Sequence, residues 1–167
     1  ADVSKSNINR LLRFLKNEKN YLGGSVTAPY KVLIMKYLDS IDENAKKIAA
    51  FLSKNKQIKL LYPYKKDSYN FRMWKKYYSG ASGLMGLKIK SKNISSVRKF
   101  VNSLKLFGYG YSWGGFESLA LHQEYREMGN RKYMNLAKDE HLVRFHIGLE
   151  DPNDLIADIK QALRHLK

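Results

Sequence analysis

Residues 142–166 join an alternating segment to an amphipathic one, and this pair limits the folds that the chain can adopt. Every second residue from 143 is apolar: Val143, Phe145 and Ile147. The residues between them are mixed in character: Leu142, Arg144 and His146. This period of two is typical of a strand with one buried face. Asp151 can cap a helix and Pro152 suits its first position, so a helix is predicted directly after the strand. A one-sided strand followed by an amphipathic helix predicts a sheet covered by helices.

The upstream segments extend this pattern. Residues 30–53 and 94–104 have a helical period, and residues 58–62 and 84–90 predict strands. Residues 63–80 predict a polar and aromatic connection, and residues 122–140 predict a loop with some helix. The predicted order is helix, strand, strand, helix, strand, strand, helix. It favours an α/β (α+β) sandwich with a mostly antiparallel sheet and helices on one face.

Residues 107–121, FGYGYSWGGFESLAL, combine four glycines with aromatic and hydroxyl side chains. Glycine allows unusual backbone conformations and lets another group approach the backbone closely. Aromatic and hydroxyl groups on such a backbone form a plausible wall for a small ligand. The alternative is a tight corner whose aromatic rings only pack, and composition alone leaves both interpretations open.

Arg144 is the side chain best suited to a ligand, because it lies in mid-strand opposite an apolar face. A guanidinium on a rigid strand can hold a carboxylate through two parallel hydrogen bonds. The alternative is a structural ion pair. The four histidines lack metal-ligand spacing, cysteine is absent, and the sequence has no phosphate-binding loop or nucleophile elbow. We therefore predict no metal site.

The positive charge is uneven along the chain. Residues 1–105 carry 23 Lys and Arg against 6 Asp and Glu, whereas residues 106–167 carry 8 against 9. A basic half suggests an acidic partner such as nucleic acid, and the alternative is a coding bias that enriches Lys, Asn, Ile and Tyr together. Because the lysines are scattered over every predicted element, we do not expect nucleic acid as the partner.

The location of the protein is predicted from what the sequence lacks. It contains no apolar run long enough for a membrane span and no apolar leader segment. The absence of cysteine is compatible with a reducing compartment. We therefore expect a cytoplasmic protein without a membrane partner.

Three blocks of the sequence resemble one enzyme family, and the similarity is strong from about residue 71 to the end. They are FRMWKKYYSGASGLMGLKIK (71–90), YSWGGFESL (111–119) and LVRFHIGLEDPNDLIADIKQAL (142–163). They are similar to the C-terminal part of cystathionine β-lyase, in the pyridoxal-phosphate-dependent family of cysteine and methionine metabolism. The signatures S-x-G-G-x-E-S-L and R-x-x-x-G-x-E-D-x-x-D-L-I-x-D occur here in the family's order. Trp113 resembles the bacterial β-lyase branch, because γ-lyases and γ-synthases, the alternatives within the family, usually have Leu there.

The resemblance implies a fold and a set of substrate-binding residues. It implies the small C-terminal domain of enzymes with the aspartate aminotransferase fold. Arg144 matches the arginine that binds the α-carboxylate of the substrate. Ser112 and Trp113 match residues that line the pocket beside it, and Tyr111 is their neighbour. The implied reaction converts cystathionine to homocysteine, pyruvate and ammonia, and the tetramers of the family imply self-association.

The same resemblance implies that parts of the site belong to an N-terminal domain. The lysine that holds pyridoxal 5'-phosphate, the aspartate on its pyridine nitrogen and the phosphate-binding loop all belong there. We therefore expect no catalytic and no cofactor-binding residue in this chain, and no activity without that N-terminal half. Residues 1–54 are expected to form a helical arm and a long linker helix toward it, and residues 55–167 the C-terminal α/β domain. PYKVLI (29–34) replaces the family's R-G-L-x-T-L pattern, so a second interpretation remains: a non-catalytic basic module, a split-gene remnant, that binds an acidic partner.

Overall fold

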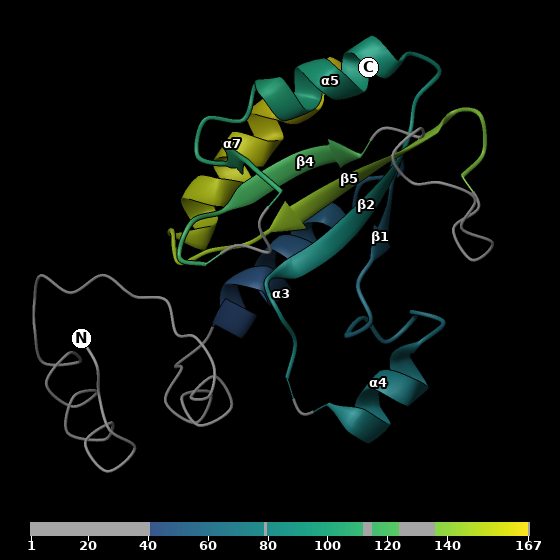
Figure 1. Ribbon diagram of the computed structural model, residues 1–167, viewed down its shortest axis with the longest axis vertical. Coiled ribbons are helices and arrows are strands. Elements are labelled where there is room, and N and C mark those ends of the chain that lie inside the picture. The colour runs from purple at the N-terminus through teal and green to yellow at the C-terminus, as the bar shows by residue number, and fades with distance from the viewer. Residues whose placement is uncertain (1–40, 79, 112–114, 124–135, 167) are drawn as a thin grey trace, which may run out of the picture. The chain divides into compact units, whose positions relative to one another are not determined.

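The computed structural model describes residues 41–78, 80–111, 115–123 and 136–166, and every structural statement below concerns these residues (Figure 1). The elements are α3 (Ile41–Leu52), β1 (Ile58–Leu61), α4 (Phe71–Tyr77), β2 (Leu84–Lys90), α5 (Ile94–Asn102), β3 (Gly108–Tyr109), β4 (Leu119–Gln123), β5 (Glu140–His146), α7 (Pro152–Ala162) and the 3₁₀ helix η2 (Leu163–Leu166). They alternate along the chain much as the sequence predicts, with two additional short elements, α4 and β3.

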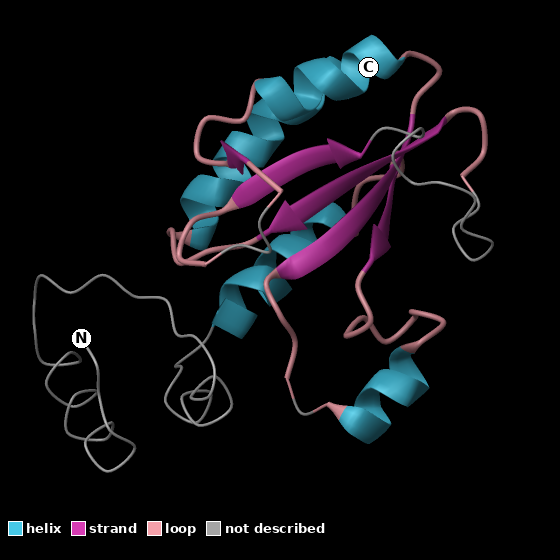
Figure 2. Ribbon diagram, viewed as in Figure 1, coloured by secondary structure: helices cyan, strands magenta, loops and turns pink. Residues whose placement is uncertain are grey.

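The described strands form one sheet in the order β1-β2-β5-β4-β3. Three of its pairings are antiparallel, and the short β3 lies parallel to β4. Figure 2 shows α3, α5 and α7 together behind the sheet, so they cover one of its faces. This arrangement confirms the predicted sandwich with a mostly antiparallel sheet.

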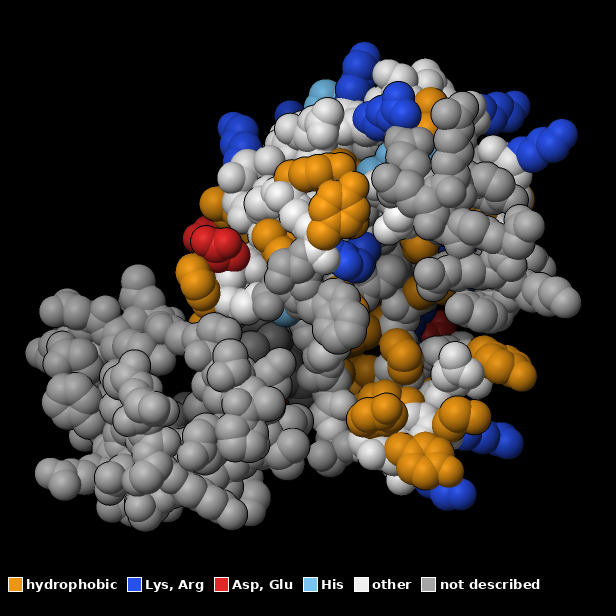
Figure 3. All heavy atoms as spheres, in the orientation of Figure 1, with side chains coloured by type: hydrophobic (Ala, Val, Ile, Leu, Met, Phe, Trp, Pro, Cys, Tyr) orange, Lys and Arg blue, Asp and Glu red, His pale blue; other side chains and the backbone are white. Residues whose placement is uncertain are grey.

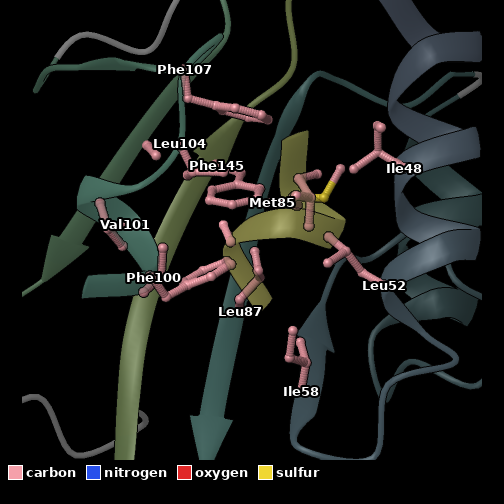
Figure 4. Close-up of a cluster of buried hydrophobic side chains, with 14 of the residues drawn as sticks. Ile48, Leu52, Ile58, Met85, Leu87, Phe100, Val101, Leu104, Phe107 and Phe145 are labelled. Carbon is pink, nitrogen blue, oxygen red and sulfur yellow. The ribbon is translucent and has the colours of Figure 1, made fainter. Parts of the chain in front are cut away.

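The core lies between the sheet and these three helices (Figure 4). Phe145 of β5 stacks on Phe100 of α5, with ring centroids 6.2 Å apart, and contacts Phe107 at 4.7 Å. Ile48 and Leu52 of α3 pack against the same cluster and are completely buried. Burying each such side chain stabilises the fold by about 1.5–3 kcal/mol. The core therefore holds β5 firmly, and β5 carries the candidate ligand residue Arg144.

The structure also corrects two predicted loops. Residues 71–77 form α4, although a connection is predicted there, because this helix of seven residues is too short to give a clear period and buries none of its residues. Residues 122 and 123 are the end of β4, where a loop is predicted. The three central residues of β4 are all buried, so the strand lacks the alternation that marks a half-exposed strand. Residues 30–40 of the predicted long helix lie outside the described residues, and the domain boundary at residue 54 stays a prediction.

Asp158 of α7 joins this helix to the connection that follows α5. Its side chain is buried, and its carboxylate accepts hydrogen bonds from the backbone N–H of Lys105 at 2.9 Å and of Leu106 at 2.8 Å. Asp158→Asn leaves one oxygen for these donors and puts an NH₂ group at the other position, where Asp158 accepts from the N–H of Lys105 at 3.0 Å and from Gln161 Nε2 at 3.0 Å. We expect the free energy of unfolding in urea to fall by about 2–3 kcal/mol, because buried donors lose a charged acceptor.

The matched control is Asp154→Asn, because Asp154 is an exposed residue in the first turn of the same helix. This variant loses a favourable negative charge at the helix N-terminus, which should lower the free energy of unfolding by only about 0.5 kcal/mol. Equal losses for the two variants would contradict the bridging role of Asp158.

Candidate substrate-binding site

Strand β5 places Arg144 on the face of the sheet that the helices do not cover. Its neighbours Val143 and Phe145 are fully buried on the helix side, so the alternation of the strand turns Arg144 the other way. Gly86 of β2 and Leu121 of β4 lie opposite it in the two flanking strands. The side chain of Arg144 is half-buried in this position. A guanidinium fixed on a strand in this way is a rigid group for binding an anion.

Residues 107–121, the glycine-rich segment, are attached to β5 at two points. Arg144 Nη2 donates to the carbonyl oxygen of Gly110 at 2.9 Å. His146 Nε2 lies 3.1 Å from the carbonyl oxygen of Gly115. Because a carbonyl only accepts, this hydrogen bond requires the proton on Nε2. The Nδ1 atom of His146 is buried without a hydrogen-bond partner among the described residues, and the ring packs on Gly83.

A second set of hydrogen bonds joins the end of this segment to the loop after β5. Glu150 accepts from Ser118 twice, from the backbone N–H at 2.7 Å and from Oγ at 2.8 Å. Ser118 Oγ in turn accepts from the N–H of Gly148 at 2.9 Å. Ser118 is completely buried, so these contacts are shielded from water and charge-assisted. They bring the blocks 111–119 and 142–163 together.

The sequence analysis missed the roles of Ser118, Gly148 and Glu150. All three belong to the signatures that carry the family resemblance, so these signatures were the available indication. Their pairing could not be inferred, because it depends on the approach of two loops about 30 residues apart.

The structure describes two of the four predicted site residues. Arg144 contacts Gly110, and Tyr111 follows directly in the chain with 65% of its surface exposed. Ser112 and Trp113 lie outside the described residues. The geometry thus brings Arg144 to the first glycines of the segment, while the substrate-binding roles of all four residues stay predictions.

Lys88 of β2 shares the sheet face of Arg144, because it lies opposite Leu142, two residues away. Its Nζ is 2.7 Å from Glu140 Oε2, and both side chains are largely buried. The hydrogen bond from Lys88 is the main cause that lowers the pKa of Glu140, and a further one from the N–H of Ala137 acts in the same direction. The lowered pKa keeps Glu140 ionised at neutral pH, as its ion pair with Lys88 requires.

The described part of the chain contains neither a metal-binding cluster nor a membrane-spanning helix. Its residues contain no group of three His, Cys, Asp or Glu side chains that could hold a metal ion. None of the described helices is both long and apolar enough to cross a membrane.

Comparison with known proteins identifies relatives over most of the chain. The family model of the Cys/Met metabolism PLP-dependent enzymes matches residues 31–164. A second model, the shikimate dehydrogenase substrate binding domain, matches residues 1–51. A cystathionine beta-lyase of Bordetella avium is 45% identical over 91 residues, which are 54% of this chain and 22% of the relative. An L-alanine/L-glutamate racemase of Wolbachia pipientis wMel is 37% identical over 124 residues, 73% of this chain and 30% of the relative.

A solved structure supports the same assignment. The crystal structure of metB from Corynebacterium glutamicum is 32% identical and superposes with a TM-score of 0.64, covering 75% of this chain and 32% of that one. This chain thus spans a third or less of the length of each of these relatives. Since the family model covers far more than half of the chain, the chain belongs to the family of Cys/Met metabolism PLP-dependent enzymes.

Proposed function

We propose that this chain is the substrate-side C-terminal portion of a pyridoxal-phosphate-dependent carbon–sulfur lyase, with cystathionine as its substrate. The observation that supports this most is the position of Arg144, half-buried on the face of the sheet opposite the core. A half-buried site strengthens the attraction between a guanidinium and a carboxylate. The hydrogen bond to Gly110 orients the guanidinium, so less rotamer freedom is lost when a carboxylate binds.

The β-lyase activity is the finer part of the proposal. The 45% identity to the Bordetella avium cystathionine beta-lyase supports it, as does Trp113 in the SWGG motif. In the proposed reaction, Arg144 holds the α-carboxylate of the amino acid. This contact determines which face of the α-carbon is turned toward the catalytic groups of the complete enzyme. The glycine-rich segment, tied to β5 through Gly110 and Gly115, forms the adjacent wall.

Lys88 is poorly suited to the role of holding pyridoxal phosphate. That role requires a lysine whose amine can lose its proton, whereas Lys88, on the sheet face of Arg144, is paired with the carboxylate of Glu140. We propose that the cofactor is held by the portion of the complete enzyme that lies outside this chain. The present chain then contributes substrate binding alone.

The Wolbachia relative supports a second candidate, an amino-acid racemase. A racemase and a β-lyase both act at the α-carbon of an amino acid, and both benefit from a fixed α-carboxylate. They differ in whether a group then leaves the β-carbon. Arg144 would have the same role in either enzyme.

Complementation separates these activities. The chain would be mixed with the N-terminal portion of the Bordetella avium enzyme and pyridoxal phosphate, and the products from cystathionine and from L-alanine would be measured. We expect pyruvate and homocysteine in equal amounts. 2-Oxobutyrate would indicate a γ-lyase instead, and D-alanine from L-alanine would indicate a racemase.

The control for complementation is the Bordetella avium enzyme divided at the same position. If its two halves regain activity and the mixture with this chain forms none of these products, the proposed function is wrong.

A further inference from the structure

A groove of about 770 Å³ lies between α3 and residues 62–78, away from Arg144. Five of the side chains that line it are aromatic: Tyr62, Tyr64, Phe71, Trp74 and Tyr78. Figure 3 shows hydrophobic side chains gathered over the position of α4, with Lys and Arg side chains at their edge. Such a concentration of rings on a surface is typical of a binding site.

The rings are organised around Trp74. Its ring stacks on Phe71 at 5.7 Å and meets Tyr64 edge-on at 5.1 Å, with an interplanar angle of 88°. Since α4 buries none of its residues, Phe71 and Trp74 lie outside the hydrophobic core, whereas Tyr64 packs against it. The contacts hold Trp74 in a defined orientation before any ligand arrives, which lowers the entropy lost on binding.

Positive charge accompanies the rings. Residues 62–78 contain five Lys and Arg and one acidic residue, Asp67. Asp67 lies 2.8 Å from Lys65, and this hydrogen bond is the main cause that lowers its pKa. Lys66 and Lys75 also line the groove, and neither forms an ion pair with another described residue. The groove therefore offers two ammonium groups beside a set of aromatic rings.

We propose that this groove binds single-stranded nucleic acid, with bases stacked on the rings around Trp74 and phosphates bound by Lys66 and Lys75. Aromatic side chains beside a positively charged groove are the combination by which proteins hold single strands without reading sequence. An acidic peptide would bind the lysines but would offer no flat group to stack on the rings. In a duplex the bases are stacked on one another, so they are not available to the rings. The net charge of +16 also draws a polyanion toward the chain.

This inference does not rest on the proposed function, and it revises the sequence-based expectation about nucleic acid. That expectation relied on lysines being scattered along the chain. The structure instead gathers Lys46, Lys65, Lys66 and Lys75 around one aromatic groove.

Fluorescence anisotropy with a labelled 12-nucleotide single strand tests the role of the lysines in the full chain. Lys66→Gln/Lys75→Gln should weaken binding at least fivefold. The slope of log K against log salt should become shallower by about 1.4, because each lost phosphate contact removes about 0.7. The matched control is Lys99→Gln/Lys160→Gln, two exposed lysines on α5 and α7, which should weaken binding less than twofold. Equal weakening by both pairs would show attraction by net charge alone and would overturn the proposal.

The rings are tested separately with Trp74→Ala and Trp74→Phe. Stacking of one base is worth about 1–3 kcal/mol, so the alanine variant should bind at least fivefold more weakly, whereas phenylalanine keeps a flat ring and should stay within threefold. Thermal unfolding followed by circular dichroism should change little, because α4 has no buried residue. A loss with phenylalanine as large as that with alanine would overturn the stacking role.

Three competing ligands complete the test. The single strand should bind at least fivefold more tightly than a duplex of the same sequence, than poly-glutamate and than vesicles of anionic lipid. Equal or tighter binding of any of the three, or no measurable binding of the single strand, would overturn the proposal.

Discussion

Replacing Arg144 with alanine in the complemented enzyme should lower kcat/KM for cystathionine by a factor of about 10²–10³. Truncating one partner of a hydrogen-bonded charge pair in a partly desolvated site costs about 3–4 kcal/mol, much of it because the other charge stays unpaired. Steady-state kinetics of pyruvate formation measure the effect. Arg144→Lys should recover only part of the loss, since an ammonium cannot form two parallel hydrogen bonds to a carboxylate.

Two controls separate carboxylate binding from the second role of Arg144, its hydrogen bond to Gly110. Arg164→Ala removes an exposed arginine from η2 and should leave kcat/KM unchanged. An analogue of cystathionine without the α-carboxylate should be a poor substrate for the parent enzyme and no poorer for Arg144→Ala. If the variant loses activity equally toward cystathionine and this analogue, Arg144 supports the loop and does not bind substrate.

Gly148→Ala should destabilise the domain by about 3 kcal/mol, the largest effect of a single methyl group expected among the described glycines. A Cβ at this position would lie 2.7 Å from the carbonyl carbon of Glu117 and even closer to the carbonyl oxygen of Phe116. It would also lie 2.6 Å from Glu150 Oε2, the atom that accepts from Ser118 Oγ. Backbone atoms cannot rotate away as a flexible side chain can, so the methyl group must separate the two loops. Overpacking costs about 1–3 kcal/mol, and weakening the buried hydrogen bonds of Ser118 adds to it.

Gly115→Ala is the matched control, because a Cβ on Gly115 would meet no atom of the described residues within 4 Å. Its effect should stay within about 1 kcal/mol, and it can be slightly stabilising because alanine restricts the unfolded chain. Urea denaturation of both variants measures the difference. If Gly148→Ala is as stable as Gly115→Ala, the two loops are not packed as tightly as described.

Sequence patterns predicted those elements in which the local signals, such as caps and periodicity, agree with the face that is buried in the fold. β5 and α7 combine alternation, a capping Asp151 and Pro152 in the first turn, and in the structure Asp151 accepts from the N–H of Asn153 at 2.7 Å. α4 and the end of β4 were predicted as loops for opposite reasons. α4 is short and buries none of its residues, whereas β4 is buried along its whole centre and so lacks alternation.

The sequence could identify single residues of the candidate site but not the contacts between them. Arg144 was identifiable from its chemistry and its place opposite an apolar strand face. The contacts of Ser118, Glu150 and His146 were not, because each depends on where a distant backbone carbonyl or N–H arrives after folding. Alternation along one strand contains no information of that kind.

The attachment of the glycine-rich segment has a consequence for how enzymes of this family diverge. Arg144 and His146 bind main-chain carbonyl oxygens of Gly110 and Gly115, which every amino acid also possesses. Mutations between these two points can therefore change side chains without removing either main-chain acceptor. With residues 111–113 in the substrate-binding role proposed above, natural selection could alter substrate preference there without first rebuilding the scaffold, and a laboratory library restricted to residues 111–114 would explore the same freedom.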